Sequence, residues 1–206
     1  RHNIKWIADF RDPWTNIDFY QELMLTSWAD KRHRALEREV LTTADKVLTI
    51  GYTMSHEMEA LGATDVETVT NGFDEDDFPS AESKLDNEFS ISHIGTFSPS
   101  RNHPIFWKAL AELKNENLDF AKNFKLRTVG VVDHNVASSI QEAGLQENWE
   151  RIDYVSHSEV LNFQLSSKVL LVSINNTPNS KGILPGKFFE YLASGRPILA
   201  IGPKDS

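Results

Sequence analysis

Apolar and polar positions along the chain follow two alternating patterns. Short apolar runs of strand character are each followed by a stretch with the period of a helix. This alternation is typical of βα units that build a parallel sheet, and it predicts an α/β protein. The expected strands cover residues 4–10, 46–51, 66–72, 89–97, 124–132, 150–156, 168–174 and 197–202. The expected helices cover residues 20–42, 55–62, 104–114, 135–143 and 158–165, with one more after Gly186.

The pattern breaks near Asn71, and we expect a domain boundary there. Residues 73–88 are acidic and rich in turn formers, which predicts a solvent-exposed linker that includes Asp74 to Asp77. The alternation then restarts with five βα steps, typical of a doubly wound sheet. The predicted domains are therefore residues 1–70 and 71–206. In the first domain, we expect Ser55 to be the N-cap of helix 55–62 and Gly62 to end it.

Composition and charge exclude several classes of protein. The 206 residues carry a formal net charge of -9, so there is no basic surplus for binding nucleic acid. The absence of cysteine excludes disulfides and thiolate metal sites, and it fits a reducing cytoplasm. No apolar run approaches the roughly 20 residues needed to cross a bilayer. The chain opens on Arg1 instead of Met, and we expect it to be part of a longer protein.

The stretch NSKGILPGKFFE carries the first candidate site. In an open α/β sheet, ligands bind at the carboxyl ends of the strands, and this stretch follows an expected strand. Backbone N–H groups after Gly186 and the side chain of Lys187 suit a phosphate or diphosphate. Glu190 lies one turn later on the same face, where a carboxylate can accept hydrogen bonds from a ribose diol. The alternative is a loop glycine followed by a solvated first-turn acid.

Three further loops hold candidate residues. In GTFSPSRNH, Arg101 suits bidentate contact with a phosphate, or it is an exposed arginine on a surface turn. His157 could contact a base, or it simply begins a helix. In DFRDPW, Asp9, Arg11 and Asp12 offer a base and its partner, or a structural ion pair. The histidines show no metal-ligand spacing, so we expect no metal site.

Four sequence blocks together resemble the retaining glycosyltransferases of the GT-B fold, of the group-1 or family-4 type. The blocks are ADKVLTIGYTMSHEMEALG, VETVTNGFDEDDF, SHIGTFSPSRN and GKFFEYLASGRPILAIG. They span nearly the whole chain, and the last is the most specific. The resemblance implies that residues 1–70 are the end of an N-terminal, acceptor-side Rossmann-like domain. Residues 71–206 would form most of a C-terminal Rossmann-like domain that binds the nucleotide sugar.

The resemblance also assigns residue roles around the donor, all on the C-terminal domain. Arg101 and Lys187 are the catalytic candidates, because stabilising the departing diphosphate is the main electrostatic task in such a transfer. Glu190 matches the glutamate that holds the ribose. The remaining donor-side matches are Gly95 in a tight turn, Gly186 at the diphosphate, and Ser156 with His157 in the loop that contacts the base. Asp9, Arg11 and Asp12 lie on the acceptor side.

One position departs from the family pattern. Where the family often has a glutamate that contacts the donor sugar, this chain has Gly182, so the identity of the donor cannot be carried over. The resemblance implies a metal-independent, cofactor-free transferase that uses a nucleotide-diphosphate sugar and a glycan or lipid-linked acceptor for cell-surface polysaccharide. It also implies a cytoplasmic enzyme, with peripheral association at the inner face of the plasma membrane. We expect the chain to be inactive alone, because the facing half of the crevice is largely missing. Two alternatives remain: a non-hydrolysing sugar-nucleotide epimerase and a non-catalytic nucleotide-sugar-binding domain.

Overall fold

The chain forms two compact units in a computed structural model, which describes residues 4–78, 84–177, 180–182 and 184–204. Unit 1 contains the chain up to Asn71 together with Thr177–Pro185. Unit 2 contains Gly72–Asn176 and Gly186–Lys204. The chain therefore passes from unit 1 to unit 2 between Asn71 and Gly72, and it returns to unit 1 for one short loop. Residues 79–83 of the expected linker lie outside the described part.

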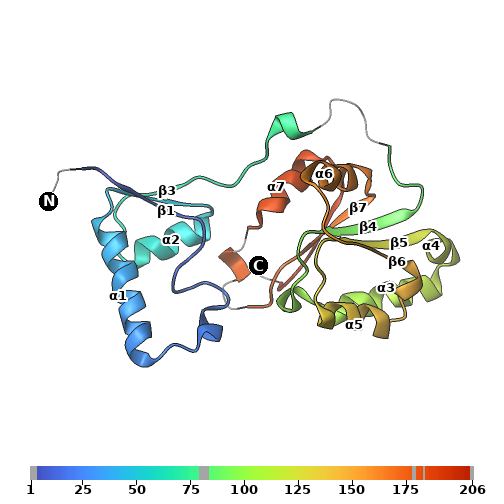
Figure 1. The fold of residues 1–206 in the computed structure, drawn as a ribbon, viewed down its shortest axis with the longest axis horizontal. Coiled ribbons are helices and arrows are strands. Elements are labelled where there is room, and N and C mark those ends of the chain that lie inside the picture. The colour runs from blue at the N-terminus through green and yellow to red at the C-terminus, as the bar shows by residue number, and fades with distance from the viewer. Residues whose placement is uncertain (1–3, 79–83, 178–179, 183, 205–206) are drawn as a thin grey trace. The chain divides into compact units, whose positions relative to one another are not determined.

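Unit 1 is a three-stranded parallel sheet with two helices, coloured blue to cyan in Figure 1. Its strands are β1 (Ile7–Phe10), β2 (Lys46–Thr49) and β3 (Val66–Thr68), in the order β1-β2-β3. Its helices are α1 (Ser27–Thr43) and α2 (Tyr52–Ala60). The core is built from apolar side chains of both layers, namely Ala8, Leu41, Val47, Met54, Met58 and Ala63.

The long helix expected over residues 20–42 is interrupted. A 3₁₀ helix covers Tyr20–Leu23, and Met24 then adopts left-handed backbone angles with φ 45°. Thr26 begins α1 as its N-cap, because its side chain accepts a hydrogen bond from the Ala29 N–H at 3.3 Å. In this role the threonine hydroxyl accepts from an N–H of the first turn. In a continuous helix that N–H would instead donate to a carbonyl of the preceding turn. The expectation of one uninterrupted helix was therefore wrong.

The expected N-cap at Ser55 was also wrong. The helix begins earlier, with Gly51 as its N-cap, and Ser55 lies inside it and is buried. The Ser55 hydroxyl lies within 2.6 Å of the Thr68 hydroxyl, and it also contacts Thr49, so it links α2 to β2 and β3. The end of the helix was predicted correctly, because α2 stops at Ala60 and Gly62 has φ 112°.

Unit 2 is a five-stranded parallel sheet with helices on both faces. The strands are β4 (Phe89–Ile94), β5 (Phe124–Val129), β6 (Trp149–Ile152), β7 (Val169–Ser173) and β8 (Ile198–Ile201), in the order β6-β5-β4-β7-β8. The helices are α3 (Pro104–Glu116), α4 (Leu118–Asn123), α5 (His134–Glu142), α6 (His157–Ser166) and α7 (Gly186–Ala193). This order is the doubly wound arrangement that the five βα steps predicted. The short helix α4 was not predicted.

Alternating strand residues build a separate core on each face of this sheet. On one face Leu126 and Leu171 pack with Trp107 of α3 and Ile140 of α5. On the other face Leu170 and Val172 pack with Tyr191 of α7, together with side chains of α6. Figure 1 shows α3, α4 and α5 on one side of the sheet and α6 and α7 on the other. Burial on both faces explains why β7 (VLLVS) is almost continuously apolar.

A buried ion pair ties the start of unit 2 to its sheet. Arg127 in β5 is only 5% exposed, and its Nη1 lies 2.6 Å from Asp86 Oδ2. Its Nε contacts Glu150 of β6, and its guanidinium lies over the Phe163 ring, 5.3 Å from the centroid. Burial alone would raise the pKa of Asp86, but the bonds from Arg127 and Ser90 outweigh it and lower that pKa. The pattern of apolar positions gave no sign of this pair.

Candidate functional site

The candidate site of unit 2 lies at the carboxyl ends of β4 and β7, where the order of the strands reverses. The ladder between these strands pairs Ile91 with Val169 and Ser92 with Leu170, and it is not continued at Ile94. Side chains of α7 satisfy Ile94 instead. Its N–H donates to Tyr191 Oη at 3.1 Å, and its carbonyl accepts from Lys187 Nζ at 2.8 Å. Because β7 does not pair with Ile94, the backbone groups of Ile94 bond to side chains of α7, and these bonds hold α7 at the switch point of the sheet.

Gly95 and Gly130 allow two loops to approach each other at this edge. Both have left-handed backbone angles, with φ 101° and 109°. A Cβ on Gly130 would lie 3.2 Å from the backbone carbon and oxygen of Gly95. A Cβ on Gly95 would lie 3.5 Å from Lys187 Nζ. Glycine is therefore favoured at both positions by conformation, and at Gly130 also by the close approach of the Gly95 backbone.

Lys187 projects from the first turn of α7 beside Gly95 and is half-buried. Burial, and after it the positive charge of Arg101, lowers its pKa to about 8, while Glu190 acts in the opposite direction. The Ile94 carbonyl at 2.8 Å also stabilises the charged form. A lysine in this position carries a partly desolvated charge, which suits an anionic ligand better than an exposed lysine would.

Arg101 is held at the same edge by the loop that follows β7. Its Nε donates to Asn175 Oδ1 at 2.9 Å, and its backbone oxygen accepts from Ser173 Oγ at 2.5 Å. The neighbouring His103 has Nε2 at 2.9 Å from the Ile174 carbonyl oxygen. Arg101 is half-buried and lies at the end of a 3₁₀ helix, Pro99–Arg101. This geometry does not fit an exposed arginine on a free surface turn.

Glu190 is half-buried and has a fixed partner, so it is not a freely solvated acid. Its Oε2 accepts a hydrogen bond from Nε2 of Gln164 at 2.7 Å, and Gln164 is fully buried in α6. The bond leaves Oε1 of Glu190 without a hydrogen bond to any residue the structure describes. A carboxylate oriented in this way, one turn after Lys187, retains acceptor capacity for the hydroxyls of a ligand.

Ser156 and His157 have structural partners. Ser156 is the N-cap of α6 and forms a capping box with Glu159. His157 Nε2 lies 3.0 Å from Asp77 Oδ2, and both side chains are about half exposed. Asp77 belongs to the acidic run that was expected to be solvent-exposed, and it is exposed, although it also contacts His157.

The acceptor-side candidates in unit 1 are exposed. Arg11 Nε lies 3.1 Å from Asp9 Oδ2, and the two side chains are 72% and 49% exposed. Asp12 is exposed as well. An ion pair this open contributes little to stability, so these side chains are free to exchange partners.

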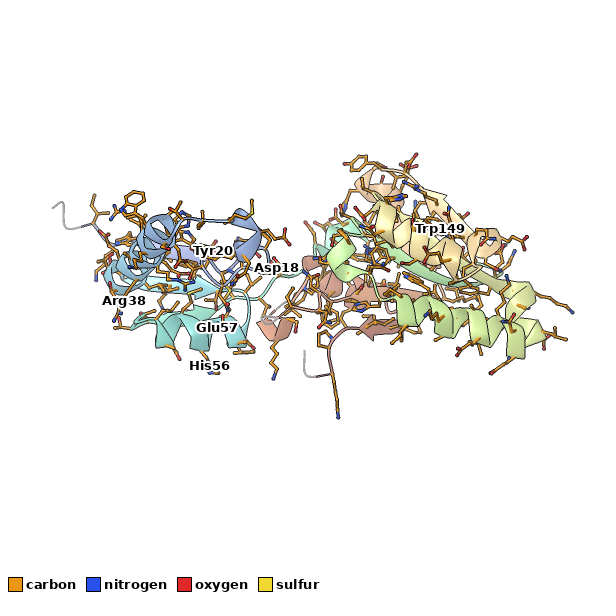
Figure 2. The ribbon with its side chains drawn as sticks, turned by 90° about the horizontal axis from the view of Figure 1, so that it is seen from below. Asp18, Tyr20, Arg38, His56, Glu57 and Trp149 are labelled. Atoms are coloured by element: carbon orange, nitrogen blue, oxygen red, sulfur yellow. The ribbon has the colours of Figure 1, made fainter. Side chains whose placement is uncertain are left out.

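Unit 1 also contains a cavity of about 420 Å³ that sequence reasoning missed. Figure 2 labels Asp18, Tyr20 and Glu57, which come from the segment after β1 and from α2 and lie around it. Its wall includes Glu37 of α1, which is 2% exposed and accepts hydrogen bonds from the N–H and hydroxyl of Thr15. Asn16 and Gln21 add amides, and Ile17, Met58, Ala60 and Leu61 add apolar surface. Asp9, Arg11 and Asp12 do not line this cavity.

The segment that carries the sequence departure at Gly182 packs within unit 1. It forms a 3₁₀ helix, Ser180–Gly182, and the Lys181 carbonyl accepts a hydrogen bond from Thr53 Oγ1 of α2 at 3.4 Å.

In the part of the chain that the structure describes, no three acidic or histidine side chains come together as metal ligands. None of the described helices is long and apolar enough to cross a membrane.

Comparison with known proteins identifies the fold. No protein-family model and no curated protein matches the chain at the level of sequence. Among solved structures, it is similar to WaaG, a glycosyltransferase involved in lipopolysaccharide biosynthesis, with a TM-score of 0.67 and 13% identity over 94% of this chain and 55% of that one. It is similar to S. aureus TarM in complex with UDP, with a TM-score of 0.61 and 16% identity over 84% of this chain and 34% of that one.

A third similar structure is a trehalose-6-phosphate synthase studied for glycosyl transfer with retention. The TM-score is 0.61, with 10% identity over 84% of this chain and 49% of that one. The chain thus spans about half of these proteins or less. Identities this low establish the fold and nothing finer. The α/β fold of this chain is the GT-B type shared by these glycosyltransferases, as its sequence blocks predicted.

Proposed function

We propose that this chain is part of a retaining glycosyltransferase and that unit 2 binds the nucleoside diphosphate of its sugar donor. The observation that carries the proposal is the ammonium of Lys187, half-buried beside Gly95 at the switch point of the sheet. Glu190 lies one turn along the same helix with an acceptor oxygen to spare. A cation followed by an oriented carboxylate matches the order of diphosphate and ribose in a nucleotide sugar.

The proposed chemistry is transfer of the sugar from diphosphate to an acceptor hydroxyl. The bond between the anomeric carbon and the diphosphate oxygen breaks, and the diphosphate keeps the electron pair. The same carbon forms a bond with the acceptor oxygen, whose proton passes to the departing diphosphate. Lys187 and Arg101 would stabilise the negative charge that develops on the leaving diphosphate, where a partly desolvated cation is most effective.

Unit 1 would take the acceptor. Asp9 and Asp12 are exposed acceptors of hydrogen bonds, and the cavity beside Glu57 joins carboxylates, amides and apolar surface. Such a mixed lining suits a polyhydroxylated ligand such as a glycan. We infer a glycan or lipid-linked acceptor for cell-surface polysaccharide, in keeping with the lipopolysaccharide role in the name of WaaG. Retention is supported by the sequence resemblance and by the similar trehalose-6-phosphate synthase.

Nucleotide binding is the first test. Calorimetric titration of the chain with UDP, GDP, ADP and CMP should give selective binding of one nucleotide. Glu190→Gln should weaken that binding about tenfold, because it removes a charged acceptor of a ribose hydrogen bond. Glu112→Gln, on the exposed surface of α3, is the matched control and should bind as the wild type does. Equal affinity of the Glu190 and Glu112 variants would contradict the assignment of Glu190.

Turnover separates the transferase from the two alternatives. A transferase consumes the nucleotide sugar only when an acceptor is present, and it yields a product with the anomeric configuration of the donor. An epimerase converts the sugar without an acceptor, and a binding domain releases no nucleotide under either condition. NMR of the anomeric protons, with the protein supplied at the length of its structural neighbours, distinguishes these outcomes.

A further inference from the structure

His93 is a buried polar residue that the proposed chemistry leaves unused. It lies in β4, one residue before Ile94, and its side chain is 0% exposed. Its ring packs against Phe97, with centroids 4.0 Å apart and an interplanar angle of 31°. Burying an imidazole is costly unless its nitrogens find partners, so the contacts of those nitrogens indicate why it is there.

The two ring nitrogens face opposite kinds of partner. Nδ1 lies 3.2 Å from the carbonyl oxygen of Leu171 in β7, and a carbonyl can only accept. Nε2 lies 3.4 Å from Lys187 Nζ, and an ammonium can only donate. Both contacts are satisfied at once when the neutral ring carries its proton on Nδ1 and its lone pair on Nε2.

The charges around the ring agree with this neutral form. Burial, and after it the charges of Lys187 and Arg101, lowers the pKa of His93 to about 3. The backbone carbonyls of Thr96 and Leu171 act in the opposite direction but do not prevail. The ring is therefore an uncharged acceptor at neutral pH, and it does not repel the lysine beside it.

Lys187 then has two acceptors inside the protein. The Ile94 carbonyl lies 2.8 Å from Nζ and His93 Nε2 lies 3.4 Å away, at the long end of the hydrogen-bond range. Because an ammonium has three N–H groups, one remains for a ligand. We propose that His93 is a positioning residue: its Nε2 lone pair holds the Lys187 ammonium beside Gly95 so that the third N–H faces an anionic oxygen of the diphosphate. This inference rests on the proposed function for the identity of the ligand, but not for the contact itself.

Two matched variants test the contact. In His93→Asn the amide nitrogen can replace Nδ1 and donate to Leu171, but no acceptor reaches Lys187. In His93→Gln the longer side chain can place its oxygen near the position of Nε2. We expect the pKa of Lys187, measured in the ligand-free protein from its ¹³Cε chemical shift, to fall in His93→Asn and to stay near the wild-type value in His93→Gln. UDP should bind about tenfold more weakly to the asparagine variant only.

A purely structural role predicts a different result. If the ring only fills space against Phe97, both variants lose stability and leave the pKa of Lys187 unchanged, which would overturn the proposal. His134→Asn, on the exposed surface of α5, controls for the loss of a histidine. Failure of every nucleotide to bind the wild type would overturn the proposed function, whereas the pKa comparison would still decide the role of His93.

A measurement on the wild type guards against variants that do not fold. In protein labelled with ¹⁵N-histidine, the shifts of His93 should be those of a ring protonated at Nδ1. The Nε2 resonance should move as Lys187 titrates near pH 8 and should lose that response in Lys187→Met. A ring protonated at Nε2 would contradict the proposal, because Nε2 could then not accept from the ammonium.

Discussion

Replacing Lys187 with methionine should reveal a charge that the fold holds at a cost in stability. Methionine has nearly the same length and no charge, so Lys187→Met removes the ammonium with little change of volume. In the unfolded chain, Lys187 keeps its proton up to about pH 10.5, whereas burial in the folded protein lowers this pKa to about 8. Between these values the unfolded state binds more protons, so the stability of the wild type rises with pH.

The size of the effect follows from the two pKa values. A tenfold change in proton affinity is worth about 1.4 kcal/mol, so lowering the pKa from 10.5 to about 8 costs about 3 kcal/mol at low pH. Because the folded protein loses this proton first, the free energy of unfolding of the wild type rises by about 2 kcal/mol between pH 7 and pH 9.5. The half-buried position of Lys187 and its bond to the Ile94 carbonyl both reduce the cost, so about 2 kcal/mol is an upper bound. The stability of Lys187→Met relative to the wild type should fall by up to this amount over the same range.

Unfolding of unit 2 has to be followed by itself. Trp107 and Trp149 both belong to unit 2, so the indole NMR signals of these residues in a urea titration report this unit alone. The free energy of unfolding is compared at pH 7 and pH 9.5 for the wild type, Lys187→Met and the exposed control Lys108→Met. If the wild type and Lys187→Met change in parallel between the two pH values, the ammonium is not desolvated and the reasoning fails.

Three further predictions use other parts of unit 2. Gly130→Ala should destabilise the protein by more than Gly144→Ala and should also weaken UDP binding; urea unfolding and calorimetry test this, and equal costs would contradict it. Both glycines have positive φ, worth about 1–2 kcal/mol, but only the Cβ added at Gly130 would lie 3.2 Å from the Gly95 backbone. Asp86→Asn should cost roughly 3 kcal/mol at pH 7, because it breaks a buried pair with Arg127. Folding lowers the pKa of Asp86, so its contribution to the free energy of unfolding is present above its unfolded pKa and is lost as the pH falls through the folded value. Asp86→Asn should therefore lose less stability on acidification than the wild type. An unchanged dependence of stability on acid pH would refute this. UDP affinity should fall as the pH rises from 7 through about 8, where Lys187 loses its proton. A flat calorimetric profile between pH 7 and pH 9.5 would count against Lys187 as the diphosphate contact.

The elements that the sequence predicted well are those with a strong period. The expected strands at residues 124–132 and 168–174 contain β5 and β7, and the helix expected over 135–143 is α5 within one residue at each end. The predictions failed where a local polar contact overrode the period. Thr26 caps α1 and breaks a stretch that reads as one helix, and Asn117 caps the unpredicted α4. Ser55 reads as a cap but is used inside α2 as a buried hydroxyl.

The sequence by itself determined the α/β class, the order of the βα units and the position of Lys187 and Glu190 at the start of the last helix. Those features follow from hydrophobic period and turn chemistry, which act over a few residues. Only the tertiary structure decided the partners of the buried polar groups. In the sequence, His93 and Arg127 are polar interruptions of expected strands with no visible partner. In the structure, His93 contacts Lys187 and Arg127 contacts Asp86, and both partners are distant in the sequence. Polar partners are chosen by distance in space, because a buried donor or acceptor must be satisfied by whatever the fold brings to it.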